Sequence, residues 1–129
     1  MIGIDTNVLV RYLVKDDPGQ SKKAATLFKS LTPEKRGFIS IIAIVETIWI
    51  LDSIYNETTE SIKEAILKLI SSRRLFVQCA DEVEAALSGD AYAGDPADAI
   101  IAQLGKAFGC EATVTFDKKA AELDGMRLL

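Results

Sequence analysis

The chain opens with the residues MIGIDTNVLVRYL, numbers 1–13. The apolar run of residues 1–4 stops at Asp5, and apolar side chains then recur at helical spacing, at Val8, Leu9, Tyr12 and Leu13. This pattern predicts a strand that leads directly into a helix. Asp5 then lies at the carboxyl end of the strand, where it also suits the N-cap of the helix.

The same alternation continues through the rest of the sequence. Helices are expected at about 18–31, 41–55, 59–73, 81–93, 95–109 and 117–123, and strands at 37–40, 75–78, 112–115 and 126–129. The helix at 41–55 is apolar nearly all round, which predicts that it is mostly buried. Strands that alternate with helices form parallel βαβ units, so we expect an α/β fold with a small parallel sheet flanked by helices.

Length, composition and charge limit the possible classes of protein. The 129 residues, with 49% hydrophobic and 26% charged residues, fit one globular domain over 1–129. The net charge of −4 argues against a general basic surface for nucleic acid. The chain has no histidine, which excludes histidine general bases, Ser-His-Asp triads and histidine-ligated zinc.

The cysteines and the apolar segments indicate a cytoplasmic protein. Cys79 and Cys110 are far apart, without CxxC spacing, so we expect two reduced thiols. The most apolar stretch, residues 39–51, is too short to span a bilayer and carries Glu46 in its middle. No basic amino-terminal region precedes an apolar segment. We therefore expect no association with a membrane.

Four acidic residues are the main candidates for chemistry. Ionised carboxylates repel one another and are costly to desolvate, so a fold that gathers several of them normally holds a divalent cation. The sequence places acidic residues at two strand ends, inside the apolar helix and at the start of a late helix: Asp5, Asp117, Glu46 and Asp98. We expect these four to be catalytic and to bind the metal.

Each of these residues also has a structural alternative. Asp5 and Asp117 suit helix caps. Asp98 follows Asp95 by three residues at the N-cap and N3 positions of one helix, where the helix dipole favours negative charge without any ligand. Glu46, in an apolar helix, needs either a Lys or Arg partner or a cation.

Further residues are candidates for supporting roles. Asn7 is expected to orient Asp5, Thr115 to steady a water or simply belong to its strand, and Asp95 to be a secondary ligand or a cap. Three cations adjoin the carboxylates and are candidates for substrate phosphates: Arg11, Lys118 and Lys119. Surface solubility is the alternative for at least one of them.

The ordered set of motifs resembles the PIN-domain ribonucleases, and most closely the VapC toxins of toxin–antitoxin pairs. The matching parts run nearly end to end and comprise residues 2–9, 44–46, 97–102 and 113–117. The resemblance implies a three-layer PIN-like fold whose acidic site contains Asp5, Glu46, Asp98 and Asp117, supported by Asn7 and Thr115. Pro96 departs from the pattern, because family members often carry an aromatic residue before the Ala-Asp pair.

The resemblance also implies an activity and partners. It implies a metal-dependent endoribonuclease that uses one or two Mg²⁺ or Mn²⁺ ions, is blocked by a VapB-like antitoxin and forms a homodimer. Three alternatives remain. A PIN protein of housekeeping RNA processing fits the same site, and a magnesium-binding receiver or interaction module fits less well, because residues 75–79 offer no phospho-accepting aspartate. A dehalogenase-like phosphatase needs Asp-x-Asp where this chain has Asp5-Thr6-Asn7.

Overall fold

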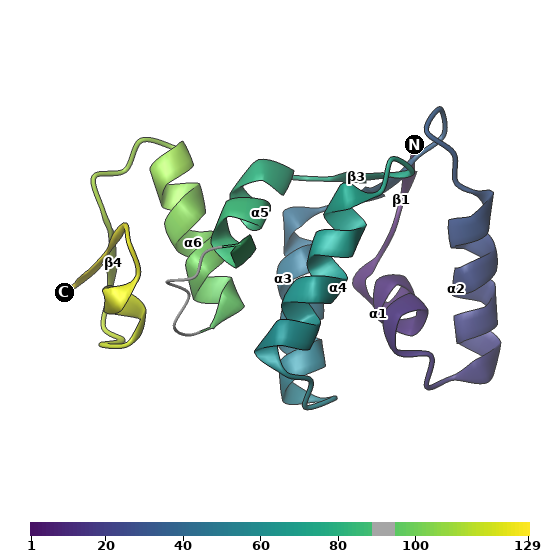
Figure 1. Ribbon diagram of the computed structural model, residues 1–129, viewed down its shortest axis with the longest axis horizontal. Helices are drawn as coiled ribbons and strands as arrows, with labels where there is room; N and C mark the ends of the chain where they lie inside the picture. Colours follow the sequence, from purple (N-terminus) through teal and green to yellow (C-terminus); the bar gives the residue numbers. More distant parts are fainter. Residues whose placement is uncertain (89–94) are drawn as a thin grey trace. The chain divides into compact units, whose positions relative to one another are not determined.

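The computed structural model describes residues 1–88 and 95–129. The chain divides into two compact units, Met1–Gln78 and Cys79–Leu129. Figure 1 colours the first from purple to teal and the second from green to yellow. The expectation that residues 1–129 form one domain stays a prediction.

The first unit is a parallel sheet with four helices. Its elements are β1 (Ile2–Gly3), α1 (Thr6–Val14), α2 (Pro18–Ser30), β2 (Gly37–Ile39), α3 (Ile41–Ser53), α4 (Thr59–Ser71) and β3 (Leu75–Val77). The strands follow the order β1-β2-β3 and all pairs are parallel, with Gly3, Phe38 and Phe76 in register. The α/β class with a small parallel sheet is therefore confirmed. In Figure 1, α3 and α4 lie side by side beneath the strands.

Side-chain caps fix where these helices begin. Asp5, Asp17, Ser40 and Thr58 are the N-caps of α1, α2, α3 and α4, and the side chain of each accepts a hydrogen bond from a backbone N–H of the first turn. Pro18 occupies the first turn of α2, where its missing N–H is not needed. The turn from α1 to α2 passes through Lys15, whose φ of 60° ends α1 in the left-handed region.

The core of this unit lies between the sheet and the helices. Alternate strand residues point into it, and Ile4, Ile39, Leu75 and Val77 are all buried. The helices contribute the fully buried side chains Leu9, Ile44, Ile48, Ile62 and Ile66. On α4, the buried residues Ile62, Ile66 and Leu69 form one stripe at helical spacing.

The prediction that the helix at 41–55 is mostly buried is wrong. In α3, Ile42 is 68% and Trp49 61% exposed, and Glu46 lies between them on the exposed side. The buried residues follow one stripe at helical spacing, Ala43, Ile44, Thr47, Ile48 and Leu51. Apolar composition alone therefore did not distinguish the packed face from the opposite one.

The second unit contains two helices and a second pair of parallel strands. Its elements are α5 (Ala80–Ser88), α6 (Pro96–Ala107), β4 (Thr113–Thr115), the 3₁₀ turn η1 (Ala120–Glu122) and β5 (Met126–Leu128). The helices pack on each other, with Val83, Leu87 and Ile100 fully buried, and β4 pairs with β5. The helix expected at 117–123 is only the three-residue η1. Residues 89–93 of the helix expected at 81–93 lie outside the described residues.

Among the described residues, no helix is long and apolar enough to cross a membrane. Cys79 is half-buried and Cys110 exposed, and both thiols are free.

Candidate active site

Asp5 lies where the sequence predicts, at the carboxyl end of β1 and the start of α1. Its Oδ1 accepts a hydrogen bond from the backbone N–H of Thr6 at 2.8 Å. The rest of the carboxylate faces solvent, since Asp5 is exposed. Asp5 is thus an N-cap with a second oxygen that has no hydrogen-bond partner among the described residues.

Thr6 links this strand end to α3 and was not predicted as a site residue. Its side chain is buried, at 7% exposure, and its Oγ1 donates to Oε1 of Glu46 at 3.2 Å. Asp5 and Glu46 therefore lie on either side of one threonine, although 41 positions separate them in the sequence. The feature of the sequence that could have identified Thr6 is its position directly after Asp5, the aspartate expected at the strand end.

Glu46 is not the buried carboxylate that the sequence suggested. It lies on the exposed side of α3, and none of the described Lys or Arg side chains forms an ion pair with it. Of the two alternatives stated for Glu46, a Lys or Arg partner is therefore not found in the described part of the chain. Thr6 holds one of its oxygens in place.

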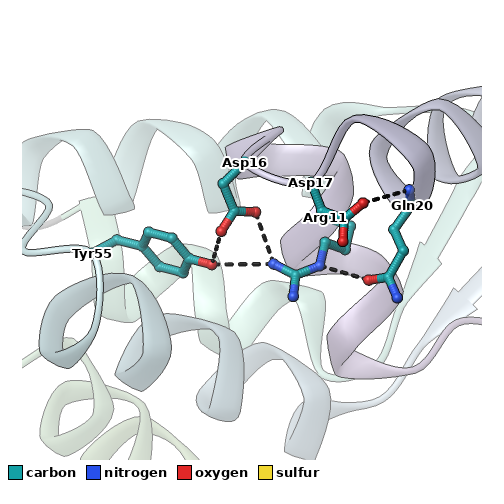
Figure 2. Close-up of polar contacts among 5 residues, drawn as sticks. All are labelled: Arg11, Asp16, Asp17, Gln20 and Tyr55. Carbon is teal, nitrogen blue, oxygen red and sulfur yellow. Dashed lines mark hydrogen bonds and ion pairs between the residues drawn. The ribbon is translucent and has the colours of Figure 1, made fainter.

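Arg11 belongs to a polar network that joins α1, α2 and the turn that follows α3 (Figure 2). Its Nη1 donates to Oδ1 of Asp16 at 2.7 Å and to the hydroxyl of Tyr55 at 3.2 Å, and its Nε donates to Oε1 of Gln20 at 2.7 Å. The Tyr55 hydroxyl in turn donates to Oδ2 of Asp16 at 2.6 Å. Tyr55 first, and the charge of Arg11 next, hold the pKa of Asp16 below its usual value.

In the second unit, Asp95 and Asp98 lie at the start of α6 as predicted. Asp95 is the N-cap, and its Oδ1 accepts from the N–H of Ala97 at 2.9 Å. Pro96 occupies the first turn and is buried. Asp98, half-buried, projects from the same turn and has no hydrogen-bond partner among the described residues. The capping role of Asp95 is thus observed, and a ligand role stays a prediction.

Asp117 caps the turn after β4 in the same way that Asp5 caps α1. Its Oδ1 accepts from the N–H groups of Lys119 at 2.8 Å and Ala120 at 3.2 Å. The hydroxyl of Thr115 accepts from the N–H of Asp117 at 3.1 Å. Thr115 therefore fixes the backbone that carries Asp117, while Lys118 and Lys119 are exposed.

Three of the aspartates of this unit, Asp95, Asp98 and Asp117, interact electrostatically. Burial raises the pKa of Asp98 above its usual value, and the negative charges of Asp95 and Asp117 raise it further. A cation near Asp98 would favour the ionised form of its carboxylate. Carboxylate oxygens are ligands that suit Mg²⁺ and Mn²⁺.

Carboxylates suit a hard divalent ion, but the described residues of neither unit form a complete metal site by themselves. Within each unit, the described residues contain no group of three or more acidic or cysteine side chains arranged to hold a metal. The first unit brings together Asp5 and Glu46 through Thr6, and the second brings Asp98 within electrostatic reach of Asp95 and Asp117. A single site made of all four predicted carboxylates stays a prediction.

Comparison with known proteins adds one finding. The sequence model described as "PIN domain" matches residues 2–126, which is nearly the whole chain. A comparison with curated proteins gave no match.

Proposed function

Because the chain belongs to the PIN domain family, whose members are generally metal-dependent nucleases, we propose that it is a Mg²⁺- or Mn²⁺-dependent endoribonuclease. The observation that carries the proposal is the position of Asp98, half-buried at the start of α6 and within electrostatic reach of Asp95 and of Asp117 after β4. Such a set of carboxylates on an acidic chain is costly unless a cation joins it. Asp5 and Glu46 contribute the remaining oxygens.

In this proposal each side chain has a distinct task. Asp5, Glu46, Asp98 and Asp117 hold one or two ions, Thr6 orients Glu46, and Thr115 fixes the turn of Asp117. When bound, the metal lowers the pKa of a water molecule and stabilises negative charge on the phosphate, which replaces the missing histidine base. Asn7 orients groups beside Asp5, and Lys118 and Lys119 meet the substrate backbone. The 2′-hydroxyl is not needed as a nucleophile.

A cleavage assay tests this directly. Purified protein is incubated with structured RNA, with Mg²⁺ or with EDTA, beside the variants Asp5→Asn and Asp98→Asn. We expect metal-dependent fragments with 5′-phosphate and 3′-hydroxyl ends, and a loss of at least about 100-fold in rate in both variants. Asp52→Asn on α3 and Glu84→Gln on α5 are matched controls, because both residues are exposed acids outside the proposed site. Cyclic 2′,3′-phosphate ends, or unchanged cleavage in either variant, would contradict the proposal.

We further propose that the nuclease is a cytoplasmic toxin, forms a homodimer and is inhibited by a VapB-like antitoxin. A groove of about 820 Å³ between α1, α2 and α4 supports a peptide partner. It is lined by the apolar residues Leu13, Phe28 and Leu69, by the cations Lys15, Lys29, Lys68 and Arg74, and by Glu64, which forms an ion pair with Lys68 at 3.3 Å. An amphipathic segment with acidic residues complements this surface.

Expression in a bacterial host separates a toxin from a housekeeping nuclease. A toxin arrests growth when expressed alone, and co-expression of a small DNA-binding protein encoded beside it restores growth. Lys29→Glu in the groove should weaken that rescue, whereas Lys35→Glu outside it should not. Growth that continues normally while RNA cleavage is retained in vitro would favour the housekeeping role.

A further inference from the structure

We propose that the groove between α1 and α2 is a subsite for a backbone phosphate of the RNA strand adjacent to the cut, and that Lys23 and Arg11 bind this phosphate. The inference rests on the proposed nuclease function and adds a place and residues for substrate recognition. Lys23 is not among the residues that the sequence pattern predicts for the site.

The groove combines cations with a small apolar floor. Asn7, Val8 and Arg11 line it from α1, and Gln20, Lys23, Ala24 and Leu27 line it from α2, around a volume of about 370 Å³. That volume lies at the lower end of the range of about 300–1,000 Å³ for ligand pockets, which suits a single nucleotide unit. Lys23 is exposed and has no ion-pair partner among the described residues.

The network around Arg11 leaves part of its guanidinium available. Figure 2 shows Nε and Nη1 engaged by Gln20, Asp16 and Tyr55, while Nη2 carries no dashed line. Gln20 is itself held, because its backbone N–H donates to Oδ1 of Asp17 at 3.0 Å. A guanidinium fixed on two sides loses little further conformational entropy when Nη2 donates to a phosphate oxygen.

The location of the groove indicates what occupies it. Asn7 lies two residues after Asp5, and Arg11 lies one helical turn further along α1. In this proposal, an RNA strand whose phosphate reaches Asp5 runs along α1 past Asn7 to the groove. Because the chain has a net charge of −4, it binds a polyanion only where cations gather beside the site. Asp16 offsets the charge of Arg11, so the net positive charge of the groove comes from Lys23.

Steady-state kinetics at several KCl concentrations test the subsite. The substrate is a fluorescently labelled RNA that the wild-type protein cleaves in Mg²⁺, and the variant is Lys23→Ala. We expect KM to rise roughly three- to tenfold at an unchanged kcat, and the slope of log(1/KM) against log[KCl] to become shallower by about 0.7, the value for one contact to a single strand. Lys22→Ala is the matched control, because Lys22 is exposed, carries the same charge and does not line the groove.

Two outcomes are distinguishable. If Lys23→Ala behaves like Lys22→Ala while the wild-type protein cleaves RNA, the subsite is refuted and the proposed function stands. If the wild-type protein cleaves no RNA, the proposed function fails and the subsite fails with it. Circular dichroism and thermal melting of both variants establish that each is folded.

Separate variants test whether Arg11 contacts the substrate and whether Tyr55 positions it. Tyr55→Phe removes the hydroxyl that holds both Arg11 and Asp16 but changes no charge, so we expect KM to rise with the salt slope retained. Arg11→Lys keeps the positive charge but loses the planar guanidinium, so it should also raise KM and retain the salt slope. Arg11→Ala removes the charge as well, so it should raise KM and make the slope of log(1/KM) against log[KCl] shallower. A KM equal to wild type in Tyr55→Phe and Arg11→Lys would show that Arg11 does not contact the substrate.

Discussion

At the scale of single residues, one hydroxyl links the two carboxylates of the first unit. Thr6 follows Asp5 directly, is buried, and donates to Glu46 on a different helix. Glu46 faces solvent and has no cationic partner in the described part of the chain. The orientation of its carboxylate therefore depends on Thr6, which makes Thr6 a positioning residue for the proposed metal.

Thr6→Val keeps the volume and removes the hydroxyl. Because outer-shell partners orient metal ligands, we expect the affinity for Mn²⁺, measured by isothermal titration calorimetry, to fall by about tenfold. Thr6→Ser retains a donor and should restore most of the affinity. Equal Mn²⁺ affinities for wild type and Thr6→Val would refute this role.

Asp16 gives a prediction for stability at low pH. Its pKa is lowered by the hydrogen bond from Tyr55 and the charge of Arg11, so in the folded protein it binds its proton less readily than in the unfolded chain. Its contribution to stability is therefore present above the ordinary value of 3.8 and is lost as pH falls through the lowered pKa. In thermal melts from pH 7 to pH 3, wild type should exceed Asp16→Asn at neutral pH, and the difference should shrink below about pH 4. A difference that does not depend on pH would contradict this account.

At the scale of elements, capping residues set the helix starts and tertiary packing sets which faces are buried. Asp17, Ser40, Thr58 and Asp95 each accept a hydrogen bond from the first turn of their helix. Asp95 was predicted as a cap from its local sequence, because capping is a contact over two or three residues. The exposed side of α3 was not predicted, because an almost wholly apolar helix has a weak periodic signal.

Gly37 in β2 provides a test of packing between the sheet and the helices. A Cβ at this position would lie 2.6 Å from Cδ1 of Ile4, 3.0 Å from Cδ1 of Leu31 and 3.1 Å from Cδ2 of Leu75. We expect Gly37→Ala to lower the free energy of unfolding by about 1–3 kcal/mol, since three buried side chains must move together. Urea denaturation measures the loss. Gly3→Ala is the control, because a Cβ there meets nothing within 4 Å. A Gly37→Ala variant as stable as Gly3→Ala would show that the core has room at this point.

At the scale of the whole molecule, the proposed metal site draws on residues from both units. Asp5 and Glu46 belong to Met1–Gln78, and Asp98 and Asp117 belong to Cys79–Leu129. If one ion needs all four carboxylates, removing an acid from either unit should abolish binding. If each unit binds an ion by itself, each single variant should remove only part of the metal binding.

Thermal melting with Mn²⁺ distinguishes these cases. A ligand at 100 times its Kd raises the free energy of unfolding by about 2.7 kcal/mol, so Mn²⁺ should raise the Tm of the wild-type protein by several degrees. We expect Asp5→Asn and Asp98→Asn each to abolish the increase, while Asp52→Asn and Glu84→Gln retain it. A retained increase in Asp5→Asn would show that the first unit takes no part in metal binding.

The sequence by itself determined the alternation of strands and helices, the parallel α/β class and the positions of Asp5, Asp98 and Asp117 at element ends. These features follow from hydrophobic period, cap chemistry and chain order, which are local properties of the chain. Tertiary structure alone decided that Glu46 lies on an exposed helix side, that Thr6 holds it, and that Arg11 is fixed by Asp16, Tyr55 and Gln20. Contacts such as Thr6 with Glu46 and Arg11 with Tyr55 join residues about 40 or more positions apart, and no local pattern encodes which of many polar side chains will meet.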